Sequence, residues 1–95
     1  MKAVYFDNAA TTPVRIEVIK SIQTALENCF GNPSSTHQFG RKAKNLVETA
    51  RKNIANLLNA TAAEIIFTAG GTEADNLILN NAVTNLGVKR MITSR

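Results

Sequence analysis

The chain has 95 residues, of which 44% are hydrophobic and 19% are charged, and its formal net charge is +4. This length is sufficient for one domain but not for two, and the hydrophobic content is too high for a disordered chain. The apolar runs are too short for a membrane-spanning helix, and the first seven residues lack the apolar region of a signal peptide. A single cysteine excludes an internal disulfide, and no Cys/His cluster indicates a metal site. We therefore expect a soluble, cytoplasmic protein without a membrane partner.

Most of the excess positive charge lies in one segment, in which a single acid, Glu48, opposes five bases: Arg41, Lys42, Lys44, Arg51 and Lys52. Apolar residues recur in the same segment at helical spacing, so the charges fall largely on the outer face of an amphipathic helix. Five aromatic residues and no RNA-binding aromatic motif make a nucleic-acid surface the weaker explanation. We therefore favour a solvated helix face and expect no direct nucleic-acid partner.

The predicted elements follow one another without a repeat or a linker. Residues 4–6 form a short extended piece, and the apolar spacing predicts helices over residues 13–28 and 39–58, separated by a Gly- and Pro-containing loop. Residues 64–68 are a strand candidate, a glycine turn follows, and a third helix over 73–86 stops at Gly87. A second strand is predicted over 88–94. This order indicates an α/β fold, and because two strands make a poor sheet, the chain looks like a piece of a larger domain.

The turn between the first strand and the third helix is the strongest local signal for a binding site. At such a turn, free backbone N–H groups and the positive end of a helix dipole meet, and glycines such as Gly70 and Gly71 allow close approach. An anion such as a phosphate fits this description, but the sequence lacks the P-loop lysine and the dinucleotide-binding glycine pattern. The alternative is a plain glycine turn in which Thr72 caps the helix and Glu73 occupies its first turn.

Three other places invite a functional interpretation, each with a structural alternative. The small residues after Asp7 would allow a ligand to approach the backbone, but ordinary loops have the same composition. His37 lies in a hydroxyl-rich loop, where it is a candidate general base or anion contact, although an exposed or capping histidine is more common. Cys29 is a candidate nucleophile, but it lies on the apolar stripe of the first helix without a basic neighbour, which favours a buried structural thiol.

Three blocks of sequence together resemble the N-terminal quarter of cysteine desulfurases, the NifS/IscS-like branch of the class V aminotransferases. The blocks are YFDNAATTP at residues 5–13, GNPSSTH at 31–37 followed by Gly40 and Arg41, and IFTAGGTEADN at 66–76. They occur in the family's order and spacing, and the resemblance covers essentially the whole chain.

The resemblance implies a pyridoxal-phosphate-dependent enzyme of fold type I, usually a homodimer. The chain would supply three helices and a strand–helix–strand unit of a larger, mostly parallel sheet. Residues 1–15 would belong to the small-domain or active-site segment, and residues 16–95 to the start of the large cofactor-binding domain. The family converts L-cysteine to L-alanine and an enzyme persulfide. The sulfur then passes to an acceptor such as an iron–sulfur scaffold or a tRNA-thiolation relay.

The resemblance also suggests roles for individual residues. Gly71 and Thr72 would hold the cofactor phosphate through a backbone N–H and a hydroxyl, and the alanine that many relatives have in place of Gly71 would keep the backbone donor. The remaining candidates line the substrate side or the wall of the active site: Asn8, Ala9, Ala10, Asn32 and His37.

No catalytic residue of the family falls within these 95 residues. The ring-stacking histidine, the aspartate at the pyridine nitrogen, the Schiff-base lysine, the substrate arginine and the persulfide cysteine are all expected further on. The chain by itself is therefore expected to be inactive. The alternatives are another class V aminotransferase or lyase, or a non-catalytic binding module of 95 residues, and the loop at residues 32–35 favours the desulfurase branch.

Overall fold

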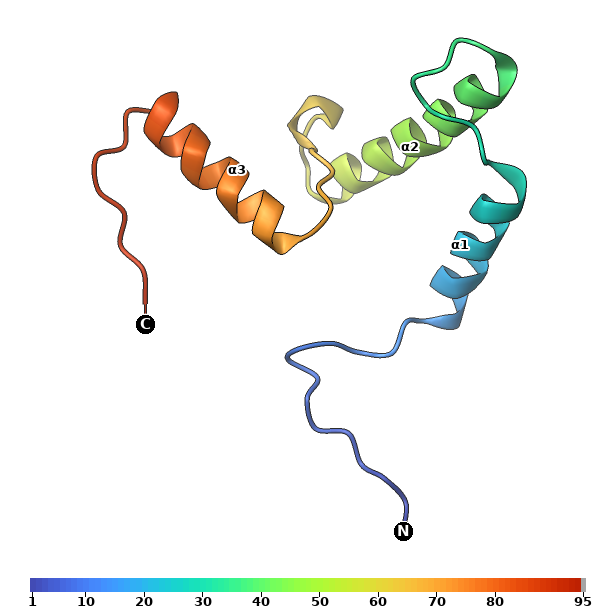
Figure 1. Cartoon of the computed structure of the whole chain (residues 1–95), viewed down its shortest axis with the longest axis horizontal. Coiled ribbons are helices and arrows are strands. Elements are labelled where there is room, and N and C mark those ends of the chain that lie inside the picture. Colours follow the sequence, from blue (N-terminus) through green and yellow to red (C-terminus); the bar gives the residue numbers. More distant parts are fainter. Residues whose placement is uncertain (95) are drawn as a thin grey trace. The chain divides into compact units, whose positions relative to one another are not determined.

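The structure is a computed structural model that describes residues 1–94, and helices are its regular elements (Figure 1). They are α1 (Ile16–Asn28), α2 (Gln38–Leu57), the 3-10 helix η1 (Ala62–Glu64) and α3 (Gly71–Thr84). The chain divides into two compact units, Met1–Ile54 and the part that begins at Ala55. The three predicted helices are confirmed, with ends that differ from the expected ones by at most three residues (expected 13–28, 39–58 and 73–86; observed 16–28, 38–57 and 71–84).

Helix α1 begins three residues later than the sequence predicts. Its N-cap, Arg15, has extended backbone (φ −62°, ψ 145°), and the amides of Val18 and Ile19 both donate to the Arg15 carbonyl. Pro13 therefore precedes the helix instead of occupying its first turn. The helix ends at Asn28, and the Cys29 amide donates to the Ala25 carbonyl at 2.8 Å.

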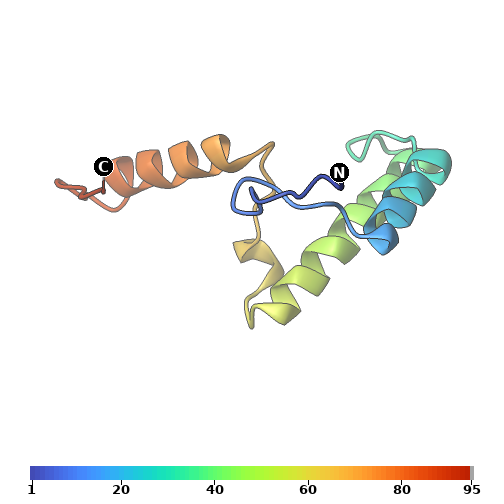
Figure 2. The same ribbon diagram turned by 90° about the horizontal axis from the view of Figure 1, so that it is seen from below.

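Two glycines let the loop between α1 and α2 pack directly on the start of α2 (Figure 2). A Cβ atom on Gly31 would lie 2.9 Å from the Gly40 nitrogen and would also meet the Phe39 carbonyl. A Cβ atom on Gly40 would lie 2.7 Å from the Asn32 carbonyl oxygen and would also meet the Ser35 carbonyl. The absence of side chains at these two positions is therefore a condition for the loop conformation.

The second unit starts with the end of α2, where an asparagine reverses the chain. Asn59 has φ +53°, the Ala60 amide donates to the Ala55 carbonyl at 2.9 Å, and the Asn59 amide donates to the Asn56 carbonyl at 3.3 Å. This is the hydrogen-bond pattern of a Schellman motif, in which asparagine takes the left-handed position that glycine usually occupies. Gly87, at φ +65°, has the same left-handed conformation after α3, as expected for a helix stop.

The predicted strand–helix–strand unit is not confirmed, because the structure assigns no strand to any part of residues 1–94. Residues 62–64 form η1, which takes the start of the segment expected to be a strand, and residues 88–94 have no regular structure. Ile65 has extended backbone (φ −95°, ψ 116°). Extended backbone becomes a strand only where a ladder of hydrogen bonds joins it to a neighbouring strand.

Few side chains are buried in the described part of the chain. The buried hydrophobic residues are Ala43 and Ala55, at 5% and 2% exposure, whereas large apolar side chains such as Leu26, Phe30 and Ile78 are exposed. The apolar sides of the helices are thus largely uncovered. Among the described residues, no helix is both long enough and apolar enough to cross a membrane.

A first prediction concerns Gly40. In an open helical position, Gly→Ala is stabilising by about 1 kcal/mol, but at Gly40 the new methyl group would meet the Asn32 and Ser35 carbonyls. We expect Gly40→Ala to lower the free energy of opening of the loop by about 1–3 kcal/mol, measured by hydrogen exchange of the Ser35 amide. Gly71→Ala is the matched control, because nothing lies within 4 Å of the place that its methyl group would take, and equal effects of both substitutions would contradict the packing argument.

A second prediction concerns the capping box of η1. The Glu64 carboxylate accepts hydrogen bonds from the Thr61 amide (2.7 Å) and the Thr61 hydroxyl (2.8 Å), and these bonds lower the pKa of Glu64 below its ordinary value. The cap should therefore be fully present above pH 4.5, the ordinary pKa of this carboxyl group, and be lost as the pH falls through the lowered pKa. We expect Thr61→Val to raise the pKa of Glu64 part of the way back, as measured by NMR titration. An unchanged pKa would show that the hydroxyl bond has no effect.

Candidate functional site

The candidate anion site is the start of α3, which the chain enters through two glycines. Gly70 is the N-cap and has fully extended backbone (φ 174°, ψ 178°), and its carbonyl accepts the Ala74 amide at 3.1 Å. Nothing lies within 4 Å of a Cβ position on Gly70 or on Gly71. The entrance to the helix is therefore open on the side where these side chains would be.

The first turn of α3 presents several donors without an acceptor. The first N–H groups of a helix have no partner within the helix, and no hydrogen bond within residues 1–94 uses the amides of Gly71, Thr72 or Glu73. The Thr72 hydroxyl likewise makes no hydrogen bond to the rest of the described chain. Three amides, one hydroxyl and the positive end of the α3 dipole thus meet in one open place, which suits an anion the size of a phosphate.

Side chains on both sides of the turn hold its shape. The Ala69 amide donates to the Glu73 carboxylate at 2.7 Å, and the Thr68 hydroxyl donates to the Gly70 carbonyl at 3.2 Å. Within the helix, the Asn76 side-chain amide donates to the Thr72 carbonyl at 2.8 Å. The sequence places Glu73 in the first turn of the helix but does not predict its bond to Ala69. An acid three residues after the N-cap is the signal that could have indicated this bond.

Asn8, Ala9 and Ala10 form a turn near the start of the chain. The amides of Ala10 and Thr11 donate to the Asp7 carbonyl at 3.1 and 3.3 Å. The Tyr5 hydroxyl lies 2.8 Å from the Asp7 carbonyl oxygen and 3.1 Å from that of Thr11, so it ties both ends of the turn together. Composition and spacing do not indicate this role of Tyr5. The turn is exposed, which leaves its small residues accessible to a ligand.

Asn32 and His37 shape the loop before α2. The Asn32 side chain accepts the Ser34 amide at 2.9 Å, and its carbonyl accepts the Ser35 amide at 3.0 Å. His37 Nδ1 accepts the Gly40 amide at 3.3 Å, so His37 caps α2, which agrees with the capping histidine considered as its alternative role. Because Nδ1 is an acceptor, the neutral ring carries its proton on Nε2. Asn32 and His37 are thus both used in local structure, and Nε2 of His37 stays available for a further contact.

The candidate residues are distributed over both compact units. The turn at residues 8–10 and the loop with Asn32 and His37 belong to the first unit, and Gly71 and Thr72 belong to the second. Within the first unit, no hydrogen bond of the described residues joins the turn to the loop. The geometry of each candidate segment is therefore described by itself.

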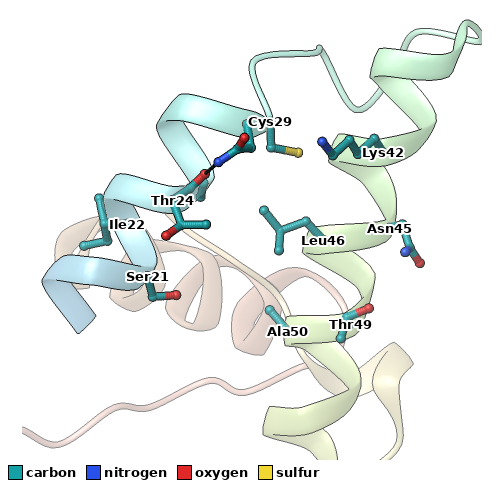
Figure 3. Close-up of a pocket in the computed structure, with 11 residues that line it drawn as sticks. Ser21, Ile22, Thr24, Cys29, Lys42, Asn45, Leu46, Thr49 and Ala50 are labelled. Atoms are coloured by element: carbon teal, nitrogen blue, oxygen red, sulfur yellow. Dashed lines mark hydrogen bonds between the residues drawn. The ribbon is translucent and has the colours of Figure 1, made fainter. Parts of the chain in front are cut away.

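Cys29 lies in a groove of about 760 Å³ between α1 and α2, within the first unit (Figure 3). Its thiol points across the groove toward the side where Lys42 extends from α2 (Figure 3). The cysteine is half-buried rather than buried as the sequence predicts. The reason is that the apolar side chains around it, Ile22 and Leu46, are themselves exposed. No group of three or more potential metal ligands occurs in the described part of the chain.

Comparisons with known proteins agree with the resemblance in the sequence. The model of the family "Aminotransferase class-V" matches residues 4–94. The cysteine desulfurase IscS of Dictyoglomus turgidum is 45% identical over 96 residues, which cover 99% of this chain and 24% of that protein. The cysteine desulfurase IscS of Methanosarcina thermophila is 51% identical over 79% of this chain, and the selenocysteine lyase of Xenopus tropicalis is 46% identical over 86%; each match covers 19% of the relative.

The chain thus spans about a fifth to a quarter of the length of these relatives. The matched region includes all three sequence blocks and the donor-rich start of α3. Because the family model matches nearly every residue, we conclude that the chain belongs to the class-V aminotransferase family.

Proposed function

We propose that this chain is the N-terminal part of a pyridoxal-phosphate-dependent cysteine desulfurase and forms one wall of its cofactor phosphate site. The observation that supports this most directly is the cluster of unpaired donors at the start of α3, formed by the amides of Gly71, Thr72 and Glu73. Membership in the class-V aminotransferase family, whose members in general depend on pyridoxal phosphate, supports the phosphate of that cofactor as the ligand of this anion site.

The residues at the turn fit the phosphate of that cofactor. The open space beside Gly70 and Gly71 lets a phosphate approach the backbone closely, and the Thr72 hydroxyl adds a side-chain donor. Hydrogen bonds from backbone amides and a hydroxyl to an anion are stronger than bonds between neutral groups. When bound, the cofactor supplies the electron sink for bond cleavage in an amino-acid substrate. The contribution of this chain is to anchor and orient the phosphate end.

The remaining candidates are assigned to the substrate side and to the wall of the active site. The turn formed by Asn8, Ala9 and Ala10 is exposed and held at both ends by Tyr5, which suits a ligand-facing backbone. The loop with Asn32 and His37 is closely packed on α2, and Nε2 of His37 remains available as a donor. In the proposed enzyme, L-cysteine yields L-alanine and sulfur. The sulfur leaves as an enzyme persulfide toward an acceptor in iron–sulfur cluster assembly or tRNA thiolation, and the full-length protein acts as a homodimer.

A lyase that acts on selenocysteine is the second candidate. The selenocysteine lyase of Xenopus tropicalis is about as similar to this chain as the cysteine desulfurases are, with 46% identity. Sulfur and selenium substrates differ at a single atom, and the phosphate anchor would serve both reactions alike. The difference between the two enzymes must therefore be tested with the substrates themselves.

A third prediction tests the phosphate anchor. Thr72→Ala removes one hydroxyl donor to a charged group, a loss of about 1.5–3 kcal/mol, so we expect the full-length protein to bind pyridoxal phosphate at least about tenfold more weakly. The measurement is the dissociation constant of the cofactor, determined by titration of the apoprotein. Thr84→Ala is the control, because the Thr84 hydroxyl donates to the Asn80 carbonyl at the far end of the same helix. Unchanged affinity in Thr72→Ala would remove Thr72 from the site.

A fourth prediction tests the reaction. We expect the full-length protein with pyridoxal phosphate to release alanine from L-cysteine, and the 95-residue chain alone to release none, because none of its residues matches the lysine that the chemistry requires. Alanine can be quantified by amino-acid analysis with L-cysteine or L-selenocysteine as substrate. Release from L-selenocysteine alone would favour the lyase, and amino-group transfer to a 2-oxo acid without sulfur release would contradict both candidates.

A further inference from the structure

The first turn of α3 contains a carboxylate beside a site that is expected to bind an anion. Glu73 directly follows Thr72, and its charge opposes the binding of a phosphate through Coulomb repulsion. Helix N-termini do favour acidic residues, but in this helix the same positive end is the proposed binding site. The position of Glu73 therefore needs an explanation other than charge.

The hydrogen bond of Glu73 supplies that explanation. The carboxylate accepts the Ala69 amide at 2.7 Å, which lies one residue before the N-cap, and it does not bond to the amides of the first turn. The bond closes a ring that contains Gly70, Gly71 and Thr72. Two adjacent glycines have more conformational freedom than any other pair of residues, and this ring restricts them to one arrangement. The Thr68 bond to the Gly70 carbonyl adds a second restraint on the same turn.

We propose that Glu73 is a positioning residue for the cofactor phosphate. It holds the Gly70–Gly71 backbone so that the amides of Gly71 and Thr72 already face the phosphate before it binds, which spares the entropy of ordering the turn. The proposal rests on the proposed function, because it assumes that the phosphate of pyridoxal phosphate binds at this turn. Glu73 would act through its acceptor oxygen and not through its charge.

Two substitutions separate these properties, and a third controls for charge. Glu73→Gln keeps an acceptor oxygen for the Ala69 amide and removes the charge, whereas Glu73→Ala removes both. Asp75→Asn removes a charge two residues further along the helix, where no side-chain hydrogen bond occurs within the described chain. The dissociation constants of pyridoxal phosphate and of pyridoxal, which has no phosphate, are measured for each apoprotein of full length.

We expect Glu73→Ala to raise the dissociation constant of pyridoxal phosphate about three- to thirtyfold, as for the loss of a helix-capping bond, and to leave that of pyridoxal unchanged. Glu73→Gln should bind pyridoxal phosphate as tightly as the parent protein or more tightly, and Asp75→Asn should match the parent protein. This pattern supports positioning through the acceptor oxygen.

Four results would overturn the inference. Tighter binding of pyridoxal phosphate by both Glu73 variants would mean that the charge alone matters. Equal loss of pyridoxal phosphate and pyridoxal binding in Glu73→Ala would indicate general structural damage. Weaker binding in Thr72→Ala with unchanged binding in Glu73→Ala would reject the role of Glu73 and keep the phosphate site, whereas unchanged binding in both variants would reject the phosphate site itself.

Discussion

The need to satisfy backbone amides at helix starts determines most of the local structure of this chain. At α2 the Gly40 amide donates a hydrogen bond to the His37 side chain, and at η1 the Thr61 amide donates to the Glu64 carboxylate. At α1 the Val18 amide turns back to the Arg15 carbonyl. At α3 the first-turn acid, Glu73, bonds outside the helix and leaves the first-turn amides without an acceptor in the described chain. A helix start alone does not make an anion site, but one with unmet amides and an open glycine entrance has the properties that a phosphate needs.

The uncovered apolar side chains of α3 support its proposed place in a larger protein. Leu77, Ile78 and Leu79 follow one another along the helix and are 45%, 65% and 48% exposed. Consecutive helical residues point in directions about 100° apart, so these three side chains cannot all face one neighbouring layer. A helix that is apolar on more than one side is expected to be covered by protein on more than one side. This fits a chain that spans 19–24% of the length of its relatives.

The sequence was sufficient to predict the three helices and the helix stop at Gly87, because these depend on neighbouring residues only. It also singled out the turn at residues 69–73 as a candidate anion site, which stays a prediction. It was not sufficient for the strands, because an extended segment such as residues 65–68 becomes a strand only through a partner strand, which local sequence does not specify. The Glu73 carboxylate accepts the Ala69 amide, and His37 Nδ1 accepts the Gly40 amide. Spacing signals that such caps can form, but the amide that each side chain reaches depends on its length and rotamer. The close packing of Gly31 and Gly40 against neighbouring backbone was not predicted either, because it depends on how the loop folds onto the start of α2.

A phosphate site made of backbone donors would tolerate substitutions at some positions of the turn and not at others. The backbone amide at position 71 is present whatever the side chain of that residue. The open space there also admits a methyl group, so an alanine would keep the same backbone donor. Thr72 differs, because its hydroxyl is the one side-chain donor of the turn, and Glu73 differs, because only an acceptor of similar length reaches the Ala69 amide. In the proposed site, the chemical requirements would thus fall on two adjacent side chains: Thr72, which would contact the anion, and Glu73, which would hold the backbone donors in place.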